Sequence, residues 1–148
     1  MSREGHVLQQ ISIFLDNKPG SLAVLARRLA DHGINLRALS LAETRDFGTA
    51  RLIVADTEAC SRALEDGGYH YIISDVIGVA VEDRPGGMAE VLEILAGEHI
   101  NVEYVYATVI SAEGNAIIII RVDDVLRAAT ILASKGVRLM NVEEIKKM

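Results

Sequence analysis

The sequence predicts an α+β protein built of two ferredoxin-like βαββαβ modules, each an antiparallel sheet with two helices on one face. Two observations lead to this fold class. The chain repeats itself once at an offset of 66 residues, and in each copy the apolar residues change from strand spacing to helical spacing and back. We expect the first module to span residues 1–75 and the second to span residues 76–148.

The repeat is clearest at a Pro-Gly turn. Residues 16–22 read DNKPGSL and residues 82–88 read EDRPGGM, so similar residue types recur in the same order. The same offset aligns Gly33-Ile34-Asn35 with His99-Ile100-Asn101 without a gap. Between residues 16–54 and 82–120, 10 of 39 positions are identical. Two copies of this length indicate a duplicated domain rather than a solenoid.

The first copy shows the elements of one module. Residues 10–16 alternate between apolar and polar side chains, which predicts a strand, and Pro19-Gly20-Ser21 then opens a helix that Gly33 ends. The remaining expected elements are a second strand from Leu36, a hairpin turn at 46–48, a third strand at 50–55, a helix capped by Thr57 and ended by Gly67-Gly68, and a fourth strand at 71–74.

The second copy repeats this order. Its expected elements are a strand at 77–81, a helix at 87–98, a strand at 102–109, a turn at 113–115, a strand at 116–122, a helix capped by Asp123 or Asp124 and ended by Gly136, and a strand at 137–142. If Val105, Ile118 and Ile120 face the helices, the opposite face of this sheet is apolar. That face would carry Tyr104, Tyr106, Ile117 and Ile119. We expect the first copy or a second chain to cover these side chains.

The composition is that of an acidic globular protein. Of the 148 residues half are hydrophobic, and the net charge is -6, which argues against nucleic acid as a partner. The longest apolar run, Ala116–Ile120, is too short to span a membrane, and residues 1–10 lack the apolar core of a secretory signal. Cys60 is the single cysteine and cannot form an internal disulfide. We therefore expect a cytoplasmic protein with no membrane partner.

Both copies resemble the ACT domain, a ferredoxin-like regulatory module that binds amino acids. Residues 17–22 (NKPGSL) and 83–88 (DRPGGM) match the loop Asn/Asp-x-Pro-Gly-x-Leu of that family, and residues 33–36 (GINL) match its Gly-x-Asn entry to the second strand. The second copy departs from the pattern at His99. The resemblance covers nearly all of the chain and implies a free-standing pair of ACT modules.

A ligand site at the two strand–helix turns follows from the chemistry of an amino acid. The N–H groups at a helix N-terminus suit its carboxylate, and Asn17 or Asp83 can accept a hydrogen bond from its ammonium group. The resemblance adds Asn35 and Asn101, usually as contacts across a module interface. The candidate ligand-binding residues are Asn17, Lys18, Gly20, Ser21, Leu22, Asn35, Asp83, Arg84, Gly86, Gly87, Met88 and Asn101.

These residues also have structural interpretations. A Pro-Gly pair is a good helix start, Asn17 is a common turn residue, and Asn35 and Asn101 tolerate a left-handed backbone. If only one copy binds a ligand, the charge of Asp83 and the Gly86-Gly87 pair favour the second copy.

No other chemistry stands out in the sequence. The four histidines lack the spacing of metal ligands and one cysteine cannot build a zinc site, so no metal or other cofactor is expected. We find no nucleophile–base pair and no phosphate-binding or dinucleotide motif, and therefore predict that the protein is not an enzyme. Cys60 is expected in the core, and Arg27-Arg28 and Lys146-Lys147 on the solvated surface.

The sequence thus predicts a non-catalytic sensor or regulator that binds an amino acid or related metabolite and forms a homodimer. An alternative is a regulatory subunit of a separately encoded amino-acid biosynthetic enzyme, which would then be its partner. Two other classes are a small ferredoxin-like enzyme, for which no catalytic pair is present, and an RNA-binding module, which would need a basic and aromatic sheet.

Overall fold

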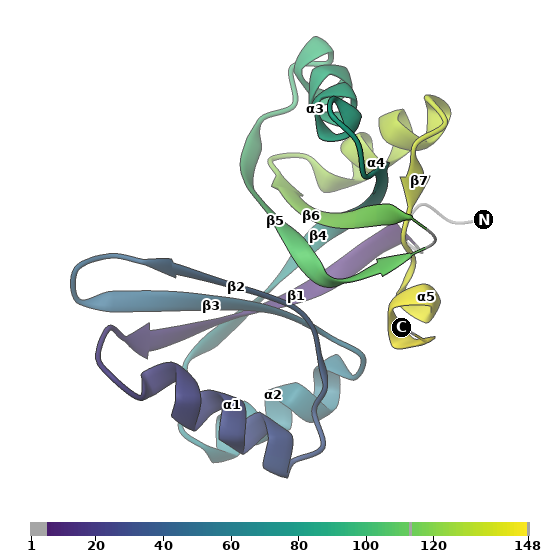
Figure 1. Ribbon diagram of the computed structural model, residues 1–148. Coiled ribbons are helices and arrows are strands. Elements are labelled where there is room, and N and C mark those ends of the chain that lie inside the picture. The colour runs from purple at the N-terminus through teal and green to yellow at the C-terminus, as the bar shows by residue number, and fades with distance from the viewer. Residues whose placement is uncertain (1–5, 113, 148) are drawn as a thin grey trace. The chain divides into compact units, whose positions relative to one another are not determined.

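The computed structural model describes residues 6–112 and 114–147, which form seven strands and five helices (Figure 1). In chain order they are β1 (Val7–Asp16), α1 (Ser21–Asp31), β2 (Leu36–Glu43), β3 (Phe47–Val54), α2 (Thr57–Asp66), β4 (Tyr71–Glu82), α3 (Gly87–Gly97), β5 (Val102–Ala112), β6 (Asn115–Val122), α4 (Val125–Ser134), β7 (Arg138–Leu139) and α5 (Val142–Lys147). The chain divides into two compact units. The first unit is Gln9–Ser74, and the second is Asp75–Met148 with the residues before Gln9.

The first unit has the strand order β4-β1-β3-β2, and its β1–β3 and β2–β3 pairs are antiparallel. Both of its helices, α1 and α2, lie on one face of this sheet (Figure 1). Alternate residues of β1 and β3 pack against them, and Ile11 pairs with Leu52 at the centre. The buried cluster consists of Ile11, Ile13, Leu15, Leu25, Leu29, Ala50, Leu52, Val54, Cys60, Ala63 and Leu64. The predicted α+β fold class is confirmed in this unit.

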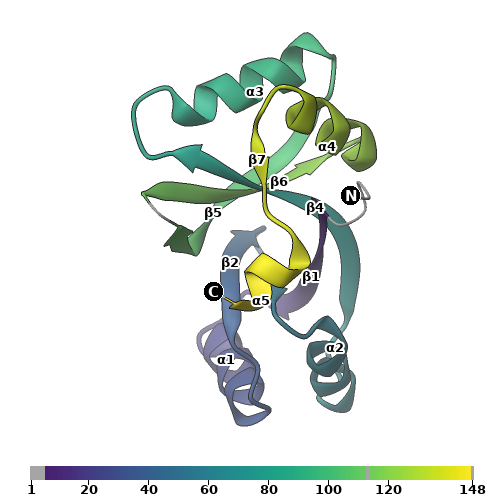
Figure 2. The same ribbon diagram turned by 90° about the vertical axis from the view of Figure 1, so that its right-hand side faces the viewer.

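The second unit repeats the arrangement with the strand order β7-β4-β6-β5, all pairs antiparallel. Helices α3 and α4 cover one face of the sheet (Figure 2). The side chains that face them include Ile118 and Ile120, with Val105 packed alongside, as the alternation predicts. The buried cluster consists of Ile77, Val79, Val81, Val91, Leu95, Ile100, Ile118, Ile120, Val122, Ala128, Ala129, Leu132 and Leu139.

Strand β4 differs from the prediction. Two separate strands were expected, at residues 71–74 and 77–81, but Tyr71–Glu82 is one continuous strand of 12 residues. Residues 71–74 belong to the first unit and residues 75–82 to the second. The intervening Asp75 is polar and suggested a break, yet a single polar side chain does not interrupt a backbone ladder, because the ladder is made by backbone groups.

The face of the second sheet opposite the helices is partly covered by the unit's own ends. Ile117 and Ile119 are buried, and they are not members of the cluster under α3 and α4. A Cβ built on Gly78 of β4 would approach the side chains of Leu8, Met140 and Ile119, so these three lie together on that face. The prediction named the other copy or a second chain as cover. Leu8 belongs to the predicted first copy, whereas the contribution of Met140 from the same copy was missed.

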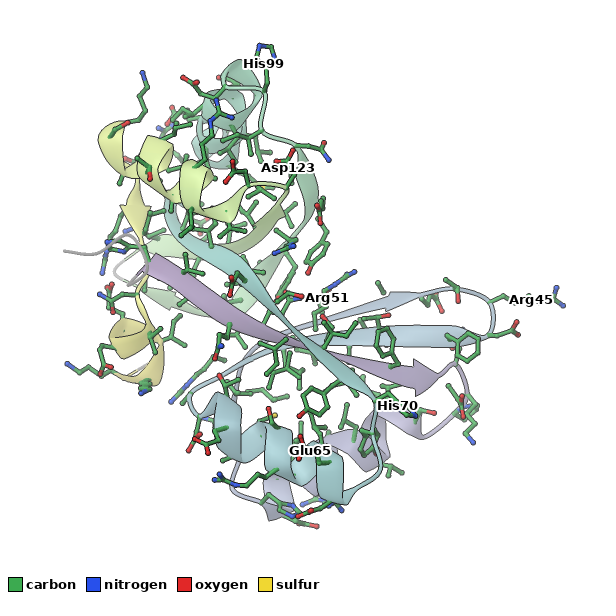
Figure 3. The ribbon with its side chains drawn as sticks, turned by 180° about the vertical axis from the view of Figure 1, so that it is seen from behind. Arg45, Arg51, Glu65, His70, His99 and Asp123 are labelled. Atoms are coloured by element: carbon green, nitrogen blue, oxygen red, sulfur yellow. The ribbon has the colours of Figure 1, made fainter. Side chains whose placement is uncertain are left out.

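Four helices end in the same way. The second residue after each helix has a positive φ: Gly33, Gly68, His99 and Gly136. The next N–H then donates back into the last turn, from Ile34 to the carbonyl of Leu29 at 2.9 Å and from Ile100 to that of Leu95 at 3.0 Å. His99, with φ 57°, is the one non-glycine residue at positive φ in the described chain, and its side chain points outward (Figure 3).

Two local predictions were wrong for reasons of hydrogen bonding. Helix α2 is capped by Asp56, whose carboxylate accepts from the N–H of Ala59 at 3.0 Å, so Thr57 is its first residue. The β2–β3 turn is centred one residue earlier than predicted, because the N–H of Thr44 donates to the carbonyl of Phe47. In the second copy, the prediction of Asp123 or Asp124 as the cap of α4 is confirmed for Asp124, and Glu113 of the predicted turn lies outside the described residues.

The predicted strand at 137–142 is confirmed in part. Only Arg138–Leu139 is a strand, and Val142–Lys147 is a helix. The side-chain oxygen of Asn141 accepts from the N–H of Glu144 at 2.8 Å, and the Glu144 carboxylate accepts from the N–H of Asn141 at 3.2 Å. This reciprocal pair is a capping box, which starts a helix in spite of the apolar Val142.

Arg28 is not a solvated surface residue as predicted. It is half-buried, and its Nε donates to the carbonyl of Ala63 in the last turn of α2 at 2.7 Å. The guanidinium is thus a second donor to the Ala63 carbonyl, which also accepts from the N–H of Gly67, and it ties α1 to α2.

We predict that Gly33→Ala destabilises the protein by about 1–2 kcal/mol, because alanine at a positive φ is strained while an added Cβ would meet nothing within 4 Å. Gly97→Ala is the matched control. Gly97 also has open space around a Cβ but lies inside α3, so alanine should stabilise by about 0.5–1 kcal/mol. Chemical denaturation measures both changes, and equal effects at the two sites would contradict the prediction.

Candidate functional site

The two strand–helix turns have the same backbone conformation. Gly20 before α1 and Gly86 before α3 both have φ 89° and ψ -13°, which only glycine adopts without strain. In each turn an N–H donates to the carbonyl at the end of the strand, from Lys18 to Asp16 and from Arg84 to Glu82. No side chain caps either helix, so the first N–H groups of α1 and α3 point out of the helix without a capping side chain.

A groove lies beside the first turn. It has a volume of about 410 Å³, and all its residues belong to the first unit. Its walls are the end of β1, the first turn of α1 and Tyr69, which lies three residues after the end of α2. We call it the first groove, and it is lined by Phe14, Leu15, Asp16, Lys18, Pro19, Gly20, Ser21, Val24 and Tyr69. It therefore combines a helix N-terminus with apolar and aromatic walls.

The second turn has a groove in the equivalent place, of about 340 Å³ and within the second unit. We call it the second groove, and it is lined by Ala80, Val81, Glu82, Gly87, Glu90, Val91, Ile94, Asn115, Lys135, Gly136, Val137 and Arg138. Six of these positions follow from the first groove by adding 66, namely Ala80, Val81, Glu82, Gly87, Glu90 and Lys135. The duplication thus preserved the place of the groove.

The linings of the two grooves differ in charge. Val24 of the first groove corresponds to Glu90 of the second, and Tyr69 corresponds to Lys135. The first turn of α1 holds no acidic residue, whereas that of α3 holds Glu90. A negative side chain in the first turn already uses the favourable field of the helix dipole. The first groove leaves that field unused.

Ion pairs occupy the second turn. Arg84 pairs with Glu82 through Nε and with Glu90 through Nη2 at 2.9 Å, and its Nη1 donates to the carbonyl of Pro85 at 3.3 Å. The hydrogen bonds to Glu82 and then Glu90 raise the pKa of Arg84 above its usual range. In the first turn, Lys18 pairs with Asp16 at 3.7 Å, and both side chains are largely exposed.

The side chain of Asn17 is hydrogen-bonded to the β2–β3 turn. Its Nδ2 donates to the carbonyl of Thr44 at 3.0 Å, with longer hydrogen bonds to the carbonyl of Arg45 and the carboxylate of Glu43. The amide oxygen of Asn17 is not used in these bonds. Asp83, its counterpart, is exposed, and its side chain forms no hydrogen bond or ion pair within the part of the chain that the structure describes.

The two other candidate asparagines, Asn35 and Asn101, do not lie at the strand–helix turns. Asn35 follows the C-terminal end of α1 and Asn101 that of α3. Each helix has 11 residues, about 16 Å in length, and separates the asparagine from the turn of its own unit. Asn101 is held by Asp123, which accepts from its N–H at 3.1 Å and donates its own N–H to the Asn101 carbonyl. The remaining candidates, Leu22 and Met88, lie in the first turns of the two helices.

Sequence reasoning did not name as candidates six of the residues that line the first groove, namely Phe14, Leu15, Asp16, Pro19, Val24 and Tyr69. Phe14 and Val24 are large apolar side chains that stay 45% and 64% exposed. Phe14 occupies a polar position of the strand alternation, and Val24 lies off the Leu22–Leu25–Leu29 stripe of the helix. Apolar residues off the core-facing pattern were therefore the available signal.

Comparison with known proteins identifies the family. The family described as ACT domain pair matches residues 6–148. The chain belongs to this family. The predicted resemblance is confirmed, and the two units carry the tandem ferredoxin-like ACT fold.

Solved structures with this ACT fold are also similar to the chain. A Bacteroides thetaiotaomicron protein is 35% identical with a TM-score of 0.91, covering 99% of this chain and 100% of that one. The regulatory subunit of aspartate kinase from Thermus thermophilus, in its ligand-free form, is 17% identical with a TM-score of 0.60, covering 88% and 92%. That from Thermus flavus is 18% identical with a TM-score of 0.56, covering 82% and 90%. No curated protein matches this ACT domain pair.

Among the described residues, no group of three or more His, Cys, Asp or Glu side chains is placed to hold a metal ion. None of the helices that the structure describes is both long and apolar enough to cross a membrane.

Cys60 is confirmed as a core residue. It is fully buried in the cluster of the first unit, and burial, with a smaller contribution from Asp56, raises the pKa of its thiol to about 11. We predict that Cys60 of the folded protein reacts slowly with a disulfide reagent at pH 8, because about one thiol in a thousand is ionised there. Denaturant should restore rapid labelling, and rapid labelling without denaturant would contradict the prediction.

Proposed function

We propose that the protein is a non-catalytic regulator, in which residues 1–75 and 76–148 are two ACT modules and the first binds an amino acid or related metabolite. The observation that carries this proposal is the first groove, which unites an uncapped helix N-terminus with apolar walls. The carboxylate of an amino acid matches the helix N-terminus, and an apolar side chain matches the walls.

The arrangement of the groove suggests how such a ligand binds. Its carboxylate accepts hydrogen bonds from the N–H groups in the first turn of α1, at Leu22 and the following residue. Its ammonium group has two acceptors at the turn, the carboxylate of Asp16 and the unused amide oxygen of Asn17. Its side chain packs against Phe14, Val24 and Tyr69, which favours an apolar amino acid.

The sequence favoured the second copy, and the side chains around the two turns favour the first. The argument for the second copy rested on Asp83 and on the glycine pair Gly86-Gly87. Asp83 does not line the second groove, and two acidic residues, Glu82 and Glu90, do. The first groove has the more apolar walls, and the first turn of its helix α1 contains no acidic residue.

Regulation requires a consequence of binding. A ligand changes the equilibrium between two arrangements of a protein only by its difference in affinity for them. We propose that the ACT domain pair acts as a cytoplasmic homodimer and that the ligand shifts its assembly or its affinity for a partner. Ile117 and Ile119 are already buried within the chain, so among the apolar sheet residues predicted from the sequence the half-buried Tyr104 and Tyr106 support a chain–chain contact.

A second candidate is a regulatory subunit of a separately encoded enzyme. The fold of the chain is similar to two regulatory subunits of aspartate kinase, and this likeness is the observation that favours it. A catalytic chain that co-purifies, and whose turnover responds to the amino acid that binds the regulator, would support this candidate. A purified regulator that binds its amino acid and alters no enzyme would argue against it.

A thermal-shift screen of the twenty amino acids tests the proposal. We predict that one or more with an apolar side chain stabilises the protein by about 2.7 kcal/mol at 100 times its dissociation constant, a rise in Tm of about 5 to 10 °C. If no amino acid raises the Tm, the proposed ligand class is wrong.

The variant Val24→Glu tests the site. A carboxylate in the first turn of α1 should repel that of the ligand and remove most of the shift. Leu126→Glu is the matched control, because Leu126 is also an exposed apolar residue in the first turn of a helix, α4 of the other unit. An equal loss of the shift in both variants would contradict the site, as would an undiminished shift in Val24→Glu.

A further inference from the structure

The second turn already carries its own carboxylates. Glu82 ends β4 and Glu90 lies in the first turn of α3, so the two side chains come from opposite walls of the second groove. Arg84 pairs with both of them and thereby connects the walls. We call these three residues the Arg84 clip.

The donors of the Arg84 clip are engaged within the protein. Arg84 uses Nε for Glu82, Nη2 for Glu90 and Nη1 for the carbonyl of Pro85. Two carboxylates surround one guanidinium, so the clip carries a net negative charge. A ligand carboxylate at this helix N-terminus would meet that charge and would have to compete for the Arg84 donors.

The first turn has no such clip. Lys18 stands in the place of Arg84 and pairs with Asp16, but Val24 stands in the place of Glu90. Within the described residues no acidic side chain therefore lies in the first turn of α1. The field of this helix N-terminus remains available to an external anion.

Packing at the backbone also separates the two turns. A Cβ built on Gly87 would lie 2.2 Å from the carbonyl oxygen of Glu82, a contact that real Cβ atoms do not make. Ser21 carries a Cβ at the equivalent position of the first turn. The start of α3 is thus packed more closely against its strand, and Gly87 is buried.

We infer that Glu90, held in place by Arg84, closes the second strand–helix turn to carboxylate ligands. Glu90 is thereby the residue that restricts each chain to one ligand. This inference rests on the proposed function of the first turn. It assigns the second copy a different part from the first, although the backbone conformations of the two turns are the same.

Acetate, a bare carboxylate, is the probe that tests this inference in the full chain by NMR. In the wild type we expect acetate to shift the amide signals of Leu22 and Ala23 in α1 and to leave those of Met88 and Ala89 in α3 unchanged. In Glu90→Gln, the signals of Met88 and Ala89 should shift as far as those of Leu22 and Ala23. Glu90→Val, which introduces the residue of the first copy, should give the same result.

Glu93→Gln is the matched control, because Glu93 is exposed on the same helix, one turn further along, and outside the clip. It should leave Met88 and Ala89 insensitive to acetate. The inference is overturned if wild-type Met88 and Ala89 respond like Leu22 and Ala23, if neither Glu90 variant opens the second turn, or if acetate shifts no amide at either turn. The proposed function fails separately, when acetate behaves as expected and no amino acid stabilises the protein.

Discussion

Each unit is held together by apolar side chains between one face of its sheet and two helices, and the candidate site depends on this packing. Leu25 and Leu29 bury one stripe of α1 against β1 and β3. That contact brings the start of the helix to the end of β1, where Gly20 makes the turn with a left-handed backbone. The first groove is the space beside this turn, so its shape is set by the core and not by the loop alone.

Duplication preserved the backbone of the turn and changed the side chains around it. Gly20 and Gly86 have the same φ and ψ, and helices end with the same hydrogen bond even where His99 replaces glycine. These features determine whether the module folds. The substitution of Val24 by Glu90 leaves the fold intact, because both side chains are exposed, and it places a carboxylate in the first turn of the helix, beside a groove that Lys135 and Arg138 also line.

Much of the fold could be predicted from the sequence, and the errors share a cause. Strand alternation correctly identified Val105, Ile118 and Ile120 as the side of the second sheet that faces its helices, because this signal repeats over many residues. The cap of α2 and the last helix were missed, since each depends on one or two hydrogen bonds between particular residues, as in the reciprocal pair between Asn141 and Glu144. For the site, sequence motifs identified the turn but not Tyr69, which lies 49 positions after Gly20 and reaches the groove only through the fold.

The sequence by itself determined the fold class, the duplication and the place of the two turns. It could do so because backbone preferences, such as a positive φ at glycine, are encoded by a few neighbouring residues. Only the tertiary structure decided that the two turns differ in what surrounds them. The first groove takes Phe14, Val24 and Tyr69 from three separate segments, and Arg84 finds Glu82 and Glu90 on two different elements. A groove and its charge depend on side chains that meet only when distant segments pack together.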